Sequence, residues 1–293
     1  MLACPAKLAG CKEVVLCTPS DANFKIHPAV LFAAKICGIN KVFKIGGSQA
    51  IAAMAIGTDT VPEVYKLFGP GNAYVTAAKQ YASLMGKAID MPAGPSEVMV
   101  IADENANPRH VAADLLSQAE RGADSQAVLV SWSKDLIEKT KQAIALLLQD
   151  LPRASITKRA LEHSKIVLVK NEQDALEVCN AYAPEHLILQ LEETDFLEDN
   201  VRNCGSVFVG YNTPESAGDY ASGTNHTLPT NGYSKQYSGV SLDSFLRYTT
   251  YQNITKEGLN TLGEKAIIPM AKAEGLDAHA LAVELRIADN KNN

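Results

Sequence analysis

The most constraining feature of this sequence is an alternation between short apolar runs rich in β-branched residues and longer amphipathic segments. The apolar runs, which predict strands, are residues 13–17, 41–45, 97–101, 127–131, 166–169, 186–191 and 206–209. The segments between them, apolar at every third or fourth position, predict helices over residues 28–37, 48–56, 73–85, 109–120, 134–149 and 174–182. Strands separated by helices form parallel βαβ units, so we predict an α/β protein with Rossmann-like parallel sheets.

The pattern also predicts where the chain divides. A length of 293 residues allows about two domains at roughly 150 residues each. The sequence Met-Pro-Ala-Gly-Pro within residues 90–96 interrupts the pattern, and a second change follows Gly232. We predict one α/β domain over residues 1–95, a second over 96–240, and a small, mainly helical tail over 241–293.

Details at the two ends refine this division. In the tail, a short strand over residues 248–254 is expected before helices over 257–274 and 278–287. The chain opens in what reads as the last turns of a helix, with no strand and no N-cap residue before it. That opening is typical of the trailing part of a longer chain, so we expect both predicted parallel sheets to be incomplete.

Composition excludes several other classes of protein. Hydrophobic residues make up 46% and charged residues 20%, which is a globular and not a disordered or coiled-coil composition. With 27 basic and 33 acidic residues the net charge is −6, so no electrostatic footprint for nucleic acid or an anionic membrane is expected. Six cysteines without a C-x-x-C pair or a secretion signal predict reduced thiols in the cytoplasm, most of them small core residues.

Residues 215–232 are rich in Gly, Ser, Thr and Asn and show little apolar periodicity. A loop of this length inside a compact domain is usually functional or disordered. Because Asp219, Tyr220, Asn225 and His226 are side chains that ligate metals or move protons, we favour a functional loop over a disordered one.

Two titratable residues, Glu185 and His186, lie side by side just after Pro184, where an apolar strand begins. An acid–base pair is one interpretation of this dipeptide. An exposed loop end is the commoner one, and the dipeptide alone does not decide between them.

Two polar groups occur on helices. Asp114, Gln118 and Arg121 follow one another at helical spacing and share a face, for which a solvated polar stripe is the favoured interpretation. Within residues 275–279, helix capping explains a glycine and an aspartate but leaves His279 unexplained.

Two glycine-bearing turns, at residues 46–49 and 69–72, each follow an apolar segment and precede a helix. Backbone amides at such helix starts attract phosphate groups. Neither turn fits G-x-G-x-x-G, since position 74 is tyrosine, so a plain tight turn explains them equally well.

Taken together, these segments resemble the histidinol dehydrogenase family. The motifs that carry the resemblance are Phe-Gly-Pro-Gly-Asn-Ala-Tyr-Val at 68–75, Asp-Met-Pro-Ala-Gly-Pro-Ser-Glu-Val at 90–98, Ala-Asp-Leu-Leu-Ser-Gln-Ala-Glu at 113–120, Ala-Pro-Glu-His-Leu at 183–187, Ser-Ala-Gly-Asp-Tyr-Ala-Ser-Gly-Thr-Asn-His at 216–226 and Ala-Glu-Gly-Leu-Asp-Ala-His at 273–279. The resemblance covers practically the whole chain. It implies a cytoplasmic, zinc-dependent homodimer that oxidises L-histidinol through the aldehyde to L-histidine in histidine biosynthesis, passing two hydrides to two NAD in succession.

The resemblance also implies roles for single residues. Gln49 and Asn72 would hold NAD, and Ser96 would contact the substrate. His186 matches the general base, which also contacts the substrate, and Glu185 matches the residue that activates water for attack on the aldehyde.

A second group matches the metal site. Gln118, Asp219 and His279 match zinc ligands that also contact the substrate, and His226 would support the base. Glu274 matches a substrate contact that, together with His279, reaches into the site of the neighbouring subunit.

The sequence departs from the family pattern in two places. The family has a histidine zinc ligand where this chain has Arg121, and a guanidinium has no lone pair with which to ligate. At ~4 Å from a divalent ion and an effective dielectric of ~20, its charge would add about 8 kcal/mol of repulsion. We therefore expect either that Arg121 turns away or that zinc binds poorly.

Full-length relatives also carry a substantial N-terminal segment with a further NAD contact. This chain is therefore expected to be a fragment, and the fragment could be inactive.

Two alternatives to this function stay open at the level of sequence. Arg121 could pair with an anionic group on another alcohol, which would keep the dehydrogenase chemistry but change the substrate. Alternatively, the chain could be a non-catalytic partner that binds nucleotide and dimerises through its helical tail.

Overall fold

The computed structural model describes residues 1–92 and 94–292, and the side chains up to residue 290. Ala93, in the middle of the predicted domain boundary, and Asn293, at the end of the predicted tail, lie outside this description. The chain separates into two compact units, Met1–Leu246 and Arg247–Asn293, which are described here one at a time. A boundary between the predicted domains at residues 95 and 96 stays a prediction.

The larger unit is built on a parallel sheet of five strands in the order β7-β6-β5-β8-β9. These strands are β5 (Glu97–Ala102), β6 (Gln126–Ser131), β7 (Lys165–Leu168), β8 (His186–Gln190) and β9 (Ser206–Val209). Val98 of β5 is in register with Ala127 on one side and with His186 on the other. The chain winds outward from β5 to β7 and then returns to β8 beside β5, so the strand order reverses between β5 and β8 as in Rossmann-like folds.

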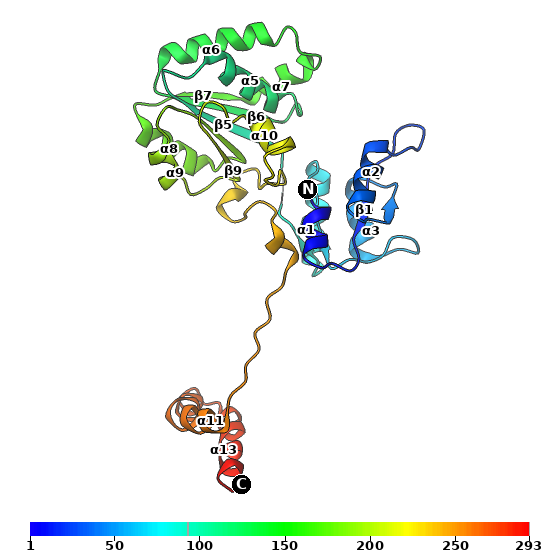
Figure 1. The fold of residues 1–293 in the computed structure, drawn as a ribbon, viewed down its shortest axis with the longest axis vertical. Helices are drawn as coiled ribbons and strands as arrows, with labels where there is room; N and C mark the ends of the chain where they lie inside the picture. Colours follow the sequence, from blue (N-terminus) through cyan, green and yellow to red (C-terminus); the bar gives the residue numbers. More distant parts are fainter. Residues whose placement is uncertain (93, 293) are drawn as a thin grey trace. The chain divides into compact units, whose positions relative to one another are not determined.

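Helices cover both faces of this sheet (Figure 1). One face carries α5 (Pro108–Ala119), α6 (Lys134–Leu147) and α7 (Ala154–His163), and the other carries α8 (Glu172–Tyr182) and α9 (Asp195–Asn200). Alternate side chains of β5 lie on opposite faces of the sheet, because successive side chains of a strand point in opposite directions. Val98 and Val100 join the core beneath α5 and α6, whereas Met99 and Ile101 join the core beneath α8 and α9.

The N-terminal part of the larger unit repeats the βα pattern on a smaller scale. Its elements are α1 (Ala3–Leu8), β1 (Val15–Cys17), α2 (Pro28–Ile36), β2 (Lys41–Phe43), α3 (Gly47–Ile56), β3 (Lys66–Leu67), α4 (Ala73–Leu84) and β4 (Ala88–Ile89). Strands β1 and β2 form one parallel pair and β3 and β4 another. Ile51 and Met54 of α3 pack with Leu67, Val75 and Ala82 in a separate core.

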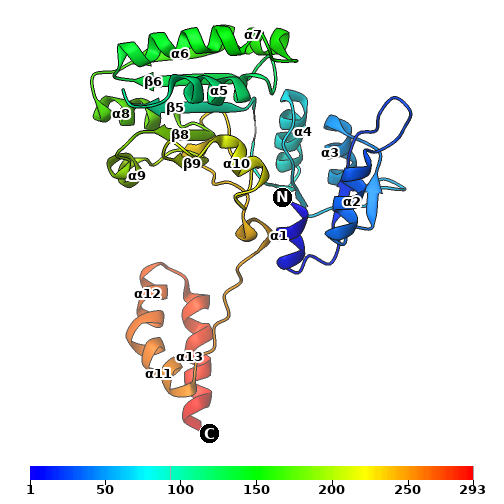
Figure 2. The same cartoon turned by 45° about the horizontal axis from the view of Figure 1, so that its top comes forward.

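The end of the larger unit contains α10 (Glu215–Tyr220) and two 3₁₀ turns, η1 (Tyr233–Lys235) and η2 (Leu242–Phe245). The smaller unit is helical: α11 (Lys256–Leu262), a π-helical turn η3 (Gly263–Ile267), α12 (Ile268–Ala273) and α13 (Asp277–Asn292) (Figure 2). The predicted strand over residues 248–254 is wrong, since these residues are irregular and exposed. A strand requires the hydrogen bonds of a neighbour, and the sheets that are described all belong to the larger unit.

The predicted fold class, α/β with parallel sheets and a helical C-terminal part, is confirmed, and all the predicted strands of the first 240 residues are present. The sequence pattern missed β3, β4, α7, α9 and α10.

The expectation that most cysteines are core residues is wrong, because Cys179 alone among the six is buried; all are free thiols. Among the described residues, no helix has the length and apolar character needed to cross a membrane.

Candidate active site

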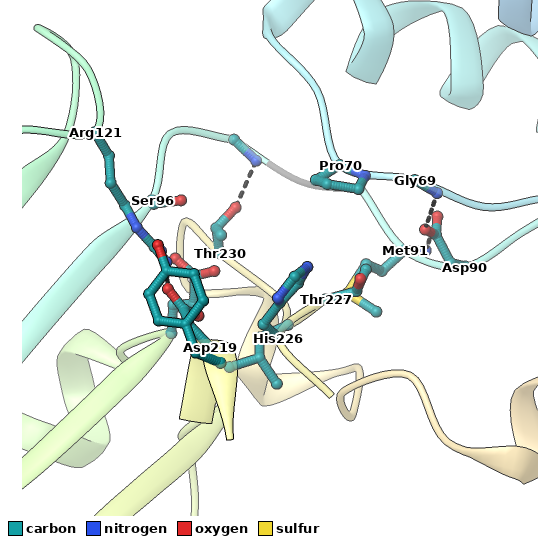
Figure 3. Close-up of a pocket in the computed structure, with 14 residues that line it drawn as sticks. Gly69, Pro70, Asp90, Met91, Ser96, Arg121, Asp219, His226, Thr227 and Thr230 are labelled. Atoms are coloured by element: carbon teal, nitrogen blue, oxygen red, sulfur yellow. Dashed lines mark hydrogen bonds and ion pairs between the residues drawn. The ribbon is translucent and has the colours of Figure 1, made fainter. Parts of the chain in front are cut away.

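A cavity of about 340 Å³ lies in the larger unit, between the glycine turn at residues 69–72 of its N-terminal part and the amino-terminal edge of the five-stranded sheet (Figure 3). Gly69 follows β3 and Asp90 follows β4, while Ser96 and Glu185 directly precede β5 and β8. Asp90 holds the first side of the cavity together, because its carboxylate accepts a hydrogen bond of 2.8 Å from the Gly69 amide and pairs with the buried ammonium of Lys79.

His186 is the first residue of β8, and 1% of its surface is exposed. Its Nδ1 lies 3.1 Å from the Glu97 carbonyl oxygen, so Nδ1 carries the hydrogen and donates it, which leaves Nε2 as the acceptor. Burial, together with the nearby charge of Arg121, lowers the pKa of His186 to about 4. The imidazole is therefore neutral at physiological pH.

Glu185, the residue before it, is 4% exposed and lines the cavity, whereas the ring of His186 lies behind the wall. The Glu185 carboxylate accepts a hydrogen bond of 3.0 Å from the Glu97 amide. Burial raises the pKa of Glu185 to about 8, although that hydrogen bond and Arg121 oppose the shift. The commoner interpretation of the Glu-His dipeptide, an exposed loop end, is wrong.

Helix α10 contributes two further carboxylates on one face, Glu215 and Asp219. One ligating atom from each of these and one from His186 all lie within 4.8 Å of one another. Glu215 is 3% exposed, and burial raises its pKa to about 7 against the opposing charge of Arg121. The sequence interpretation missed Glu215 because it treated residues 215–232 as irregular; the helical spacing of Glu215 and Asp219 was the available signal.

Arg121 extends into this acidic cluster (Figure 3). Its guanidinium lies 3.2 Å from a Glu215 oxygen and forms a second ion pair with Asp219. Burial disfavours the charged form, but Glu215 and Asp219 outweigh it and raise the pKa of the guanidinium. The Arg121 side chain thus points into the cluster in this structure, and the expectation that it either turns away or weakens zinc binding stays a prediction.

Gln118 and Asp114 precede Arg121 on α5, and both are buried, so the expectation of a solvated polar stripe is wrong. The Asp114 carboxylate accepts a hydrogen bond of 3.0 Å from Gln190. Neither the amide nitrogen nor the amide oxygen of Gln118 has a hydrogen-bond partner among the described residues. A buried amide without partners is costly to the fold.

The remaining predicted site residues are divided between the two units. Ser96 and His226 line the cavity, whereas Gln49 is exposed near the start of α3. The Asn72 side chain caps α4, accepting hydrogen bonds of 3.1 and 3.2 Å from the amides of residues 74 and 75. Neither Gln49 nor Asn72 is among the residues that line the cavity.

Glu274 and His279 belong to the smaller unit. They are exposed on either side of the break between α12 and α13, where Gly275 adopts a positive φ of 72°. This backbone conformation favours glycine at the end of a helix.

The parallel α/β fold, with a cavity lined by a buried carboxylic acid and backed by a neutral imidazole and further carboxylates, is typical of an enzyme that transfers protons. Comparison with known proteins supplies the particular family. The family model described as histidinol dehydrogenase matches residues 1–287. The chain belongs to the histidinol dehydrogenase family, whose members are oxidoreductases of histidine biosynthesis.

Individual relatives agree. A histidinol dehydrogenase from Bacteroides thetaiotaomicron is 61% identical over 287 residues, covering 98% of this chain and 67% of the relative. One from Bacteroides fragilis is 60% identical over 289 residues, with 99% and 67% covered. The crystal structure of histidinol dehydrogenase from Elizabethkingia anophelis superimposes with a TM-score of 0.95 at 53% identity, covering 99% of this chain and 66% of that one. The chain thus spans about two thirds of the length of these relatives.

Proposed function

We propose that the chain carries the site for NAD-dependent oxidation of L-histidinol, through L-histidinal, to L-histidine. The observation that carries this proposal is the buried Glu185–His186 pair at the cavity, in which the imidazole is neutral and its Nδ1 is held by the Glu97 carbonyl. Because Nδ1 is engaged, Nε2 is the ring atom left to take the proton of an alcohol.

The proposed oxidation consists of two rounds of proton and hydride loss separated by the addition of water. Nε2 of His186 accepts the hydroxyl proton while the carbinol carbon gives up a hydride; NAD supplies the hydride acceptor. Water then adds to the aldehyde, and oxidation of the hydrate repeats the same proton and hydride losses to give the carboxylate. Glu185 takes the proton of the attacking water only when it is ionised, so this step gains rate as the pH rises toward about 8.

NAD would be held in the N-terminal part of the larger unit by Gln49 and Asn72. Both residues lie at the start of a helix, where backbone amides attract phosphate. At Gly71, a Cβ atom would lie 2.5 Å from Val75, so only glycine fits the turn that leads into α4. Ser96 would contact the substrate, and His226, exposed at the cavity, would support the base.

The residues present do not fit zinc in this chain. The buried Gln118 amide oxygen suits a ligand, but the Asp219 carboxylate is already paired with the guanidinium of Arg121. A fixed positive charge beside the proposed ligands opposes a divalent cation. We therefore derive no step of the reaction through zinc.

The proposal includes a cytoplasmic homodimer. Its support is the family, the free cysteines, and the exposure of Glu274 and His279, which leaves both available to a neighbouring subunit. We propose that these two residues complete the substrate site of the other copy.

The alternative of an anionic alcohol is not favoured. The guanidinium of Arg121 is already matched by the carboxylates of Glu215 and Asp219, so it offers no unmatched charge to an anionic substrate.

The test is NADH formation from L-histidinol by the purified chain and by His186→Asn. A matched control is His163→Asn, which replaces an exposed histidine at the end of α7. Loss of the general base should lower the rate by about 10²–10⁴-fold in the first variant and leave the second unchanged. A folded chain that binds NAD but forms no NADH from histidinol would instead support the non-catalytic nucleotide-binding partner.

A further inference from the structure

The cluster formed by His186, Glu215 and Asp219 has the chemistry of a divalent metal site. Its imidazole and carboxylate donors lie within 4.8 Å of one another, and Glu215 and His186 are buried. Such a set of nitrogen and oxygen donors suits zinc. The ionised carboxylates need a positive charge beside them, since buried charges are costly unless they are paired.

Arg121 already supplies that neutralisation. Its guanidinium reaches both carboxylates of α10 at once, at 3.2 Å from Glu215 and in direct contact with Asp219. A planar guanidinium with several N–H groups suits such double pairing, and it stays charged at all physiological pH values. The cluster therefore carries its own cation as part of the chain.

We propose that Arg121 takes the place of a divalent metal ion in this cluster, so that the chain holds zinc there only when residue 121 carries no positive charge. For zinc to enter, the guanidinium would have to leave two largely buried carboxylates and remain near the ion. Removing one partner of a buried pair is strongly unfavourable, and the ion would also meet like charge. The proposal does not depend on the reaction proposed above, because its readout is bound metal and not turnover.

The experiment compares zinc retention by the whole chain and by Arg121→Lys, Arg121→Gln and Arg121→His. Each protein is equilibrated with zinc, dialysed and assayed for metal content, and its affinity is measured by competition with a chromogenic chelator. The unchanged chain and Arg121→Lys should retain no zinc beyond the background of the free thiols. Arg121→Gln should gain zinc because the charge is gone, and Arg121→His should gain more because it adds a ligand, with affinity about 10–100-fold above the unchanged chain.

Two controls locate the metal. Arg109→His adds a histidine at an exposed position of α5, outside the cavity, and should change nothing. Asp219→Asn combined with Arg121→His should lose the gained zinc. Thermal unfolding verifies that each variant folds. If Arg121→His does not fold, zinc retention by Arg121→Gln alone decides the test. Zinc held by the unchanged chain as tightly as by Arg121→His would overturn the proposal, and so would variants without charge that bind no more zinc than the unchanged chain.

Discussion

At the scale of single residues, burial has opposite effects on two neighbours. Glu185 and His186 are both nearly inaccessible, and burial disfavours whichever form is charged. The pKa of Glu185 therefore rises to about 8 while that of His186 falls to about 4. Near neutral pH the pair is a protonated carboxyl that lines the cavity and a neutral imidazole directly behind it, one a proton donor and the other a proton acceptor.

The shifted pKa of Glu185 predicts a pH dependence of stability. Between about pH 4.5 and 8 the folded chain keeps a proton that the unfolded chain has released, so the free energy of unfolding falls as the pH rises. One such group changes it by at most about 1.4 kcal/mol per pH unit. Glu185→Gln, which cannot titrate, should show a shallower decline in urea denaturation across this range, whereas the exposed Glu162→Gln should keep the original slope. Equal slopes for all three proteins would contradict the prediction.

The unpaired amide of Gln118 predicts a gain in stability on substitution. Gln118→Met keeps a similar volume and removes two buried polar atoms that have no partner among the described residues. The free energy of unfolding should rise by about 1–3 kcal/mol, the usual penalty of an unsatisfied buried group. Gln126→Met is the control, because its amide nitrogen donates to the His163 carbonyl and its amide oxygen accepts from the Tyr182 hydroxyl, so this change should destabilise the fold. A destabilised Gln118→Met would show that this amide is satisfied in solution.

Several residues of the site could be predicted from sequence and others could not. Glu185, His186, Ser96 and Asp219 were singled out, and the structure places them at or beside one cavity. Glu215 was missed because residues 215–232 were interpreted as a loop, and the sequence could not show that Arg121 and His186, remote along the chain, pack against it.

At the scale of elements, strands that are buried on both faces were predictable because their sequences are continuously apolar. β5 and β8 are examples, with every residue buried. The very short β3 and β4 were missed because two residues carry no periodicity, and α10 because its glycine and serine weaken helix propensity. Tertiary packing, and not local propensity, holds such elements in place.

The turn before α4 gives a prediction at this scale. Gly71→Ala would bring a Cβ atom to 2.5 Å from both Cβ and Cγ1 of Val75, so the turn must shift. Overpacking of this kind costs about 1–3 kcal/mol of stability, and displacement of the neighbouring Asn72 should weaken NAD binding. Val75→Gly removes all the clashing atoms, its Cβ included, so the double variant should be more stable than the sum of the two single changes predicts. Simple additivity in thermal unfolding and in NAD titration would rule out the clash as the cause.

At the scale of the whole molecule, the placement of the cavity is unusual for a parallel sheet. Ligands of open α/β sheets bind beyond the carboxyl ends of the strands, at the point where the strand order reverses. Here Asp103, just past the carboxyl end of β5, is instead engaged by Tyr211 at 2.9 Å and by the Glu192 amide at 2.7 Å. Ser96 and Glu185 lie at the amino ends of β5 and β8, facing the carboxyl ends of β3 and β4. The N-terminal part thus lines the cavity with the carboxyl ends of its strands, as is usual, whereas the five-stranded sheet lines it with the amino ends of its strands. Strand periodicity in the sequence could not show which edge would be used.

The smaller unit supports a prediction about assembly. Leu281 and Leu285 lie one turn apart on α13 and are 51% and 57% exposed. If a second copy covers them, as proposed for the homodimer, each half-exposed leucine gains about half of the roughly 1.5–3 kcal/mol of full burial. Counted in both subunits, one position contributes about 1.5–3 kcal/mol, which is roughly tenfold or more in the dimer dissociation constant. Leu281→Lys and Leu285→Lys should therefore shift sedimentation-equilibrium profiles toward the monomer. Leu146→Lys, at an exposed position of α6 in the larger unit, should not. A dimer that persists unchanged in both α13 variants would place the interface elsewhere, and the proposed sharing of Glu274 and His279 between subunits would then lose its structural basis.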